Sequence, residues 1–323
     1  MRKILVTGGA GFIGSNLCEH LINNGFHVVC LDNFSTGHMK NIKHLVDDNN
    51  IPFELIEGDI RNFETCMRAV NGVDYVFHEA ALGSIPRSIN DPITTNDVNI
   101  GGFLNMLVAS RDSHVKRFIF AASSSTYGDS KELPKIEERI GKPMSPYALT
   151  KYVDELYADV FAKTYGIEFI GLRYFNVFGR RQDPDSMYAA VIPLFIKQFI
   201  NHKQPIINGN GDYSRDFTYV DNVIHMNMLA METESAEAVN QIYNTAGGER
   251  TSINDLAVLI QSFLCEIDSS IKDIKPIYGP YRNGDIPHSM ASIEKARKLL
   301  GYMPIVHFKE GLKRTIDWYL ENE

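Results

Sequence analysis

The fold is decided by a stretch close to the N-terminus, Lys3-Ile4-Leu5-Val6-Thr7-Gly8-Gly9-Ala10-Gly11-Phe12-Ile13-Gly14. Its apolar half predicts a buried strand, and the spacing that follows predicts a helix over Phe12–Asn23. Glycines between a strand and a helix allow a tight turn and let the backbone approach a pyrophosphate at the helix N-terminus. The stretch therefore predicts a G-x-G-x-x-G turn that binds a dinucleotide through Gly8, Gly11, Phe12, Ile13 and Gly14.

Beyond this stretch, short apolar runs alternate with helical segments through the first half of the chain. Helical periodicity is seen over Phe12–Asn23 and Gly101–Ser110, for example. Strand–helix alternation predicts a parallel sheet with helices on both faces, and right-handed crossovers make it a doubly wound α/β (Rossmann) sheet. The strands are expected at Lys3–Thr7, His27–Leu31, Phe53–Glu57, Tyr75–His78, Arg117–Ala121 and Glu168–Leu172.

The pattern becomes irregular after about residue 175. A strong turn signal stands at Asn208-Gly209-Asn210-Gly211, and short helices are expected at Ser252–Phe263 and Ile293–Leu300. Residues 218–245 are expected to return a helix and a strand, Gln241–Thr245, to the main sheet. We therefore expect a cofactor-binding domain over residues 1–175, joined by about 218–245. Residues 176–323 should mainly form a smaller C-terminal substrate-binding lobe.

The bulk properties exclude several classes of function. The 323 residues carry a formal charge of −8, so nucleic acid is not an expected partner. The cysteines are widely spaced, which argues against a zinc cluster or a disulfide framework and for reduced thiols in a cytoplasm. No apolar run approaches the ~20 residues of a membrane span, and the N-terminus enters a strand and not a signal peptide. We expect a cytoplasmic protein with no metal and no membrane contact.

An acidic residue at the end of the second expected strand bears on the choice of dinucleotide. Asp32 stands eighteen residues after Gly14. A carboxylate there accepts hydrogen bonds from ribose hydroxyls and repels a 2′-phosphate, which favours NAD over NADP. The alternative is a loop carboxylate that caps the next turn. Asp59 and Ile60, after the third strand, are candidates for contact with the adenine ring.

A tyrosine and a lysine four residues apart occur in Tyr147-Ala148-Leu149-Thr150-Lys151. Ser145-Pro146 before them suits a helix start, and at that spacing both side chains lie on one face of a helix. The ammonium favours the phenolate, which is a general base suited to carbinol oxidation beside a nicotinamide. A second copy at Tyr127–Lys131 contains Gly128-Asp129 and is expected to be a turn.

Taken together, these motifs resemble the extended short-chain dehydrogenase/reductase superfamily. The segments that carry the resemblance are Gly8-x-x-Gly11-x-x-Gly14, Asp32-Asn33, Gly58-Asp59-Ile60, His78-Glu79-Ala80-Ala81, Asn99, Ser123, Tyr147 with Lys151, and Arg173-Tyr174-Phe175-Asn176. Within the superfamily the chain resembles nucleotide-sugar 4-epimerases. The group acting on UDP-N-acetylglucosamine is the most similar in appearance, through Ala81–Ser84, Ala121–Gly128 and Tyr188–Pro193.

The resemblance implies a redox-neutral cycle with NAD. Tyr147 would take the proton of the sugar O4 while C4 gives its hydride to NAD. The 4-keto sugar would then rotate within the pocket, and the hydride would return to the opposite face of C4. Lys151 would hold the nicotinamide ribose. Ser123 would hydrogen-bond O4, with Ser124 and Ser125 as adjacent candidates. Further cofactor contacts are implied for Asn33, Ser35, Thr36, Gly37, Ala80, Ala81, Asn99, Tyr147, Lys151, Tyr174 and Val177.

The resemblance also implies a UDP-sugar site and a homodimer. Arginines suit a diphosphate, although a surface ion pair is the simpler reading of each one taken singly. Small residues at Gly83, Ser84, Ala190 and Ser289 leave room for an N-acetyl group, so UDP-N-acetylglucosamine and UDP-N-acetylgalactosamine are the expected substrates. Substrate contacts are implied for Gly83, Ser84, Arg87, Ser88, Ser123, Ser124, Asn176, Ala190, Val191, Arg215, Arg282, Asp285 and Ser289.

Other functions stay open at this point. A sugar 4,6-dehydratase resembles this chain but carries an acidic pair after the catalytic hydroxyl, where this chain has Ser124 and Ser125. A 4-epimerase of UDP-glucose or of an N-acetylhexosaminuronic acid, or a decarboxylase, fits the same motifs. A non-catalytic NAD-sensing protein belongs to a different class; such proteins usually lose the tyrosine or the lysine, and this chain has both.

Overall fold

The computed structural model describes residues 1–281 and 286–322 and contains a seven-stranded parallel sheet. The strand order is β11-β6-β5-β4-β1-β2-β3, and every neighbouring pair is parallel. The direction of winding reverses between β1 and β4, where ligands of open α/β sheets bind. The predicted doubly wound fold is confirmed. The strands are β1 (Lys3–Thr7), β2 (His27–Asp32), β3 (Phe53–Glu57), β4 (Tyr75–His78), β5 (Arg117–Ser123), β6 (Glu168–Tyr174) and β11 (Gln241–Thr245).

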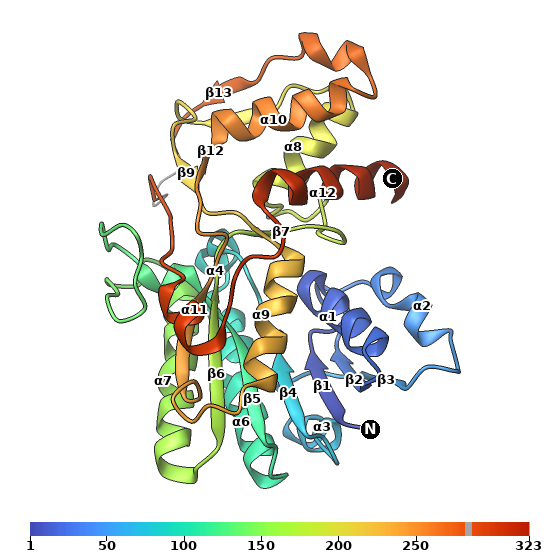
Figure 1. Cartoon of the computed structure of the whole chain (residues 1–323), viewed down its shortest axis with the longest axis vertical. Coiled ribbons are helices and arrows are strands. Elements are labelled where there is room, and N and C mark those ends of the chain that lie inside the picture. Colours follow the sequence, from blue (N-terminus) through green and yellow to red (C-terminus); the bar gives the residue numbers. More distant parts are fainter. Residues whose placement is uncertain (282–285, 323) are drawn as a thin grey trace.

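Helices cover both faces of this sheet (Figure 1). Alternate residues of β1 point to opposite faces, so Ile4 and Val6 pack in the core under α1 (Phe12–Asn23) and α9 (Val220–Glu232), and Leu5 packs in the other core. The second core lies under α3 (Phe63–Ala69), α6 (Phe103–Asp112) and α7 (Pro146–Tyr165). Smaller elements are η1 (Met39–Asn41), α2 (Lys43–Val46), α4 (Ile85–Asn90), α5 (Pro92–Asn96), the π-helical turn Asp97–Gly102 and η3 (Ser124–Tyr127).

Most of the remaining elements form a smaller lobe beyond the carboxyl ends of the strands (Figure 1). In the described part of this lobe, two-stranded ladders join β10 to β7, β12 to β9 and β13 to β8. The lobe elements are β7 (Val177–Phe178), α8 (Val191–Ile200), β8 (Ile206–Asn208), β9 (Ser214–Arg215), β10 (Thr218–Tyr219), β12 (Thr251–Ser252), α10 (Ile253–Cys265), η4 (Ser269–Asp273), β13 (Ile277–Gly279) and α12 (Phe308–Asn322). Helix α11 (Glu294–Leu300) instead packs beside β11 of the sheet (Figure 1).

The observed elements differ from the expected ones mainly at their ends. β5 and β6 each run two residues further than expected, because Ala122 pairs with Arg173 and Ser123 with Tyr174. Backbone pairing does not require an apolar side chain, so polar residues stay in the ladder. In the part of the chain that the structure describes, no helix has the length and apolar character to cross a membrane.

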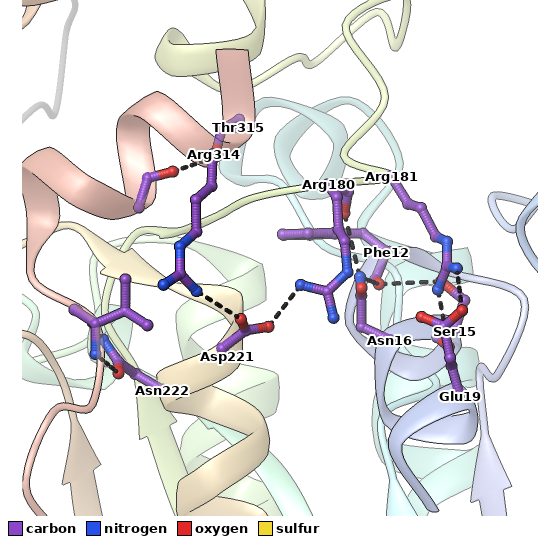
Figure 2. Close-up of polar contacts among 12 residues, drawn as sticks. Phe12, Ser15, Asn16, Glu19, Arg180, Arg181, Asp221, Asn222, Arg314 and Thr315 are labelled. Atoms are coloured by element: carbon purple, nitrogen blue, oxygen red, sulfur yellow. Dashed lines mark hydrogen bonds and ion pairs between the residues drawn. The ribbon is translucent and has the colours of Figure 1, made fainter. Parts of the chain in front are cut away.

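Polar contacts hold the loop after β7 against helix α1 (Figure 2). The Arg181 guanidinium donates to Glu19 at 2.9 Å and to the Ser15 carbonyl at 3.2 Å. The Arg180 guanidinium donates to Asp221, on α9, at 2.6 Å. This loop leads into α8, so the lobe is tied to the two helices that cover one face of the sheet.

Candidate active site

Two adjoining cavities open at the carboxyl edge of the sheet. The first has a volume of about 400 Å³, and the second, which reaches into the lobe, about 800 Å³. Asn176 and Val177 line both, so the cavities meet where β6 passes into the lobe. Asn176 donates to the Asp216 carbonyl at 3.0 Å, which fixes its side chain at this junction.

The glycine turn has the geometry that a pyrophosphate requires. Gly8 has φ +66°, and a Cβ there would lie 2.8 Å from the Ala80 nitrogen. A Cβ on Gly14 would lie 2.2 Å from the Gly8 carbonyl oxygen, so larger residues are excluded at both positions. Gly11 is the N-cap of α1, and no side chain caps this end. The first N–H groups of the helix are therefore available to an anion.

Asp32 both shapes the loop and lines the first cavity. Its carboxylate accepts from the Ala10 N–H at 2.9 Å and from the Phe34 N–H at 2.8 Å. Burial raises the pKa of this carboxyl. A Cβ on Gly37 would lie 3.0 Å from one Asp32 oxygen, so a glycine there keeps this approach open. Each carboxylate oxygen has a second lone pair, so loop capping and a ribose contact are compatible.

Asp59 lines the same cavity and is held by two neighbours. Arg61 donates to its carboxylate at 2.7 Å and Asn33 donates to it at 2.9 Å. The Arg61 guanidinium lowers the pKa of Asp59 to about 2, so the group is ionised at neutral pH. The other predicted cofactor residues that line this cavity are Gly8, Gly11, Phe12, Ile13, Gly14, Asn33, Ser35, Thr36, Ile60, Ala80, Ala81, Tyr147, Lys151, Tyr174 and Val177.

Asn99 stands behind the cavity wall and supports it. Its amide donates to the Leu82 carbonyl at 3.2 Å and to the Thr150 hydroxyl at 3.1 Å, and its carbonyl accepts from the Leu82 N–H at 2.8 Å. Asn99 does not line the first cavity itself, although Leu82 does. The structure therefore gives this residue a positioning role between the loop after β4 and helix α7.

The tyrosine and lysine of the pentad lie in the first cavity together with Ser123. Helix α7 begins at Pro146 with Ser145 as its N-cap, whose hydroxyl accepts from the Ala148 N–H at 3.1 Å. The Lys151 ammonium is buried and donates to the Ala121 carbonyl at 2.9 Å. A fixed ammonium beside a phenol in one cavity is an arrangement for proton transfer.

The three consecutive serines have different surroundings. Ser123, at the end of β5, lines the first cavity, and its hydroxyl accepts from the Ser125 hydroxyl at 2.8 Å and from the Ser125 N–H at 3.1 Å. Ser124 and Ser125 line neither of the two cavities. Of the three candidates, Ser123 is therefore the one whose position suits contact with a ligand.

The second copy of the pentad is a turn, as the sequence predicts. Tyr127 ends the short helix η3, and Gly128 follows with φ +50°. The Tyr127 hydroxyl donates to Asn244 at 2.7 Å, and its ring lies 4.9 Å from the Arg173 guanidinium carbon. Burial raises the pKa of Tyr127 to about 12. Tyr127 is thus a packed structural residue, and it does not line the first cavity.

The predicted substrate residues divide by position. Ser88 is buried and donates to the Ile85 carbonyl at 2.8 Å, and the Arg87 guanidinium lies 5.3 Å from the centre of the Tyr188 ring. The Ser289 N–H donates to the Ser214 carbonyl at 3.0 Å, and Ser289 lines neither cavity. Arg282 and Asp285 lie outside the described residues. Gly83 lines the first cavity, and the second is lined by Ser84, Asn176, Ala190, Val191 and Arg215.

Two acidic residues that the sequence did not single out stand at the site. Asp154 lies behind Lys151, and Glu79 lines the first cavity. Glu79 accepts from the Tyr174 hydroxyl at 2.7 Å, and burial raises its pKa to about 7. The neighbouring His78 is a packed strand histidine: burial lowers its pKa to about 3, so its ring is neutral. Within residues 1–281 and 286–322 no cluster of His, Cys, Asp and Glu could hold a metal ion.

The fold and the site define a dinucleotide-dependent enzyme, and known proteins identify its family. A model of the NAD dependent epimerase/dehydratase family matches residues 4–246. A putative UDP-glucose 4-epimerase of Methanocaldococcus jannaschii is 37% identical over 321 residues, which are 99% of each chain. The chain belongs to the NAD-dependent epimerase/dehydratase family, and NAD is its cofactor.

Solved structures of similar proteins point to the same family. A UDP-N-acetylglucosamine 4-epimerase from Methanobrevibacter ruminantium, in complex with UDP-N-acetylmuramic acid, is 37% identical with a TM-score of 0.91, over 100% of this chain and 99% of the other. A UDP-glucuronic acid 4-epimerase from Bacillus cereus, in complex with UDP-glucuronic acid and NAD, is 32% identical with a TM-score of 0.90, over 99% and 100%. The predicted resemblance to nucleotide-sugar 4-epimerases of the extended short-chain dehydrogenase/reductase type is confirmed.

Proposed function

We propose that this protein is an NAD-dependent, redox-neutral 4-epimerase of UDP-hexoses, and that UDP-N-acetylglucosamine and UDP-N-acetylgalactosamine are its substrates. One observation carries the proposal: Ser123, Tyr147 and Lys151 share one cavity with the glycine turn, and that cavity adjoins a larger one in the lobe. The first cavity offers a site for NAD and the second a site for a nucleotide sugar. Their junction at Asn176 is where the sugar and the nicotinamide would meet.

Tyr147, Lys151 and Ser123 have different roles in the proposed reaction. Bound NAD supplies a hydride acceptor and donor for C4 of the sugar. Tyr147 removes the proton of O4 and later returns it, and the Lys151 charge favours the phenolate during the first step. Ser123 donates a hydrogen bond to O4, because its hydroxyl already accepts from Ser125 and keeps its own proton free to donate.

The second cavity has features that suit a UDP-sugar. Arg215 supplies a guanidinium at its wall for a diphosphate. Helix α8 starts at this wall with Ala190 as N-cap and no side-chain cap, so its N–H groups can receive the same anion. The N-acetyl preference rests on space: apart from Gly83 and its two chain neighbours, no described residue has a heavy atom within 4 Å of a Cβ built on Gly83. UDP-glucose and UDP-glucuronic acid are the competing substrates, since the similar proteins carry those names.

We also propose a cytoplasmic homodimer. Helix α7 exposes three apolar side chains on its outer surface, Leu149, Leu156 and Val160, and α5 exposes Ile93. Burying these side chains against a second copy of the chain would remove apolar surface from water. The division into a cofactor domain over residues 1–175, joined by about 218–245, and a lobe over 176–323 belongs to this proposal.

A panel assay tests the function. Purified protein is incubated with UDP-N-acetylglucosamine, UDP-glucose and UDP-glucuronic acid separately, and proton NMR with mass spectrometry follows the products. We expect a C4 epimer of unchanged mass from the acetylated sugar, and about one equivalent of NAD and NADH together on denaturing the protein. A dehydrated or decarboxylated product, or a need for a second redox substrate, would contradict the proposal. Turnover of UDP-glucose or UDP-glucuronic acid only would move the assignment to that sugar.

A further inference from the structure

Glu79 is a half-buried acidic residue that the proposed chemistry does not use. It follows β4 directly and lines the same cavity as Tyr147 and Lys151. The Tyr174 hydroxyl donates to its carboxylate at 2.7 Å, and that hydroxyl accepts from the Asn227 amide at 2.8 Å. Both hydrogen bonds in this series, from Asn227 to Tyr174 and from Tyr174 to Glu79, point toward Glu79. The arrangement therefore stabilises a negative charge on the Glu79 carboxylate.

Among the residues that the structure describes, this carboxylate has no close positive partner. Tyr174 is its only hydrogen-bond partner, and no cation forms an ion pair with it, among the residues that the structure describes. The Lys151 ammonium acts on it only from longer range, because that group is held by Ala121 and Asp154. The other titratable neighbour, His78, is neutral. Because burial raises the pKa of Glu79 to about 7, this carboxyl is partly protonated at neutral pH, and a cation that enters the cavity favours its ionised form.

We propose that Glu79 is the counter-charge of the oxidised nicotinamide, so that this protein binds NAD⁺ in preference to NADH. Hydride transfer requires the nicotinamide beside Tyr147, in the cavity that Glu79 lines. The ring is positive only in the oxidised form. A carboxylate in a cavity of low dielectric therefore distinguishes the two forms by charge, since their shapes are similar.

This preference suits an enzyme whose cofactor must end each cycle oxidised. A site that favours NAD⁺ drives the hydride back to the sugar and keeps the reduced state short-lived. Glu79 would thus protect the enzyme from being left with NADH after a ketone escapes. The inference rests on the NAD cofactor and is independent of which sugar the protein uses.

An exchange experiment on the purified protein tests this inference without any sugar. The protein is equilibrated with equal concentrations of NAD⁺ and NADH, freed of unbound cofactor and denatured, and the released forms are separated by chromatography. Glu79→Gln keeps an acceptor for Tyr174 and removes the charge. We expect the ratio of bound NADH to bound NAD⁺ in this variant to rise roughly tenfold over the wild type. A charge interaction strong enough to shift a pKa by about one unit changes an equilibrium ratio by that factor. Glu79→Asp keeps the charge, so its ratio of bound NADH to bound NAD⁺ should stay within about twofold of the wild-type ratio.

Two further variants make the experiment decisive. Glu137→Gln removes a buried carboxyl that lines neither cavity, and it should leave the ratio unchanged. Glu79→Leu is a second uncharged variant and replaces the carboxyl by an apolar side chain if the glutamine variant does not fold. An unchanged ratio in a folded, cofactor-bearing uncharged variant would overturn the inference. So would an aspartate variant that behaves like the glutamine variant. Neither result would bear on epimerisation, because no sugar is present.

Discussion

The Asp154 carboxylate lies 3.4 Å from the Lys151 ammonium, and both side chains are buried on α7. The ammonium also donates to the Ala121 carbonyl at 2.9 Å, so it is held between its own helix and strand β5. A lysine has a flexible four-carbon stem, and two acceptors fix where its charge lies. Asp154 is therefore a positioning residue for the lysine that lines the first cavity.

Replacing Asp154 by asparagine should destabilise the protein, because it leaves a buried ammonium without its charged partner. The expected loss in the free energy of unfolding is about 3 kcal/mol. The matched control is Asp159→Asn, which breaks the exposed Lys163–Asp159 pair on the same helix. That change should cost less than about 1 kcal/mol. Urea denaturation with NAD present measures both, and equal losses would refute the positioning role.

Replacing Tyr147 by phenylalanine should lower kcat by about 10²–10⁴-fold, because the acid/base hydroxyl is lost. NAD content, measured after denaturation, should stay close to that of the wild type. The control is Tyr127→Phe, which removes the hydrogen bond to Asn244. It should cost about 1 kcal/mol of stability with little change in kcat. If the Tyr127 variant were inactive and the Tyr147 variant active, Tyr127 would be the acid/base residue and Tyr147 would not.

The serines can be separated by single alanine substitutions. Ser123→Ala should lower kcat by about 10²-fold, because it removes a donor to the reacting oxygen. Ser124→Ala should have an effect below about twofold on kcat, since Ser124 lines neither cavity and a donor outside the site contributes no transition-state contact. Initial rates at saturating substrate measure both. A larger effect at Ser124 would mean that the sugar approaches from another side.

The N-acetyl preference can be tested by filling space at Gly83. Gly83→Leu should reduce turnover of UDP-N-acetylglucosamine more than that of UDP-glucose, because the larger substrate requires the room that the leucine takes. Overfilling a packed site costs about 1–3 kcal/mol, roughly 5- to 150-fold in kcat/KM. Gly101→Leu is the control, because Gly101 also has open space around its Cβ position but lines neither cavity. Equal losses for both sugars would contradict the steric argument.

The cofactor half of the fold could be read from the sequence because its strands are apolar and its helices periodic. β1, β3, β4 and β11 have the expected bounds, as does α1. The lobe could not be read in this way. Its strands are two or three residues long and pair with partners far along the chain, as β7 does with β10 and β8 with β13. Strands this short show no alternation, so no periodic signal marks them.

The site was predictable where a motif fixes the spacing, and less so where residues support others. The glycine turn, Tyr147 and Lys151 fall together in one cavity as expected. The sequence did not point to Asp154, because an acidic residue on a helix is normally exposed. Glu79 belongs to the motif His78-Glu79-Ala80-Ala81, but the motif itself indicates no separate role for this side chain. Its significance depends on Tyr174, which comes from β6 and lies 95 residues further along the chain.

The place of β11 has a consequence for biosynthesis. This strand is added to the edge of the sheet beside β6, along Gln241–Thr245, only after residues 175–240 have been made. Until the ribosome has released that segment, β6 presents an unpaired edge, which is a template for aggregation. A fragment truncated near residue 176 would keep that edge permanently open. The nascent chain is therefore expected to need a chaperone until residues 241–245 have been made, and expression of residues 1–175 alone should require residues 218–245 to be supplied with them.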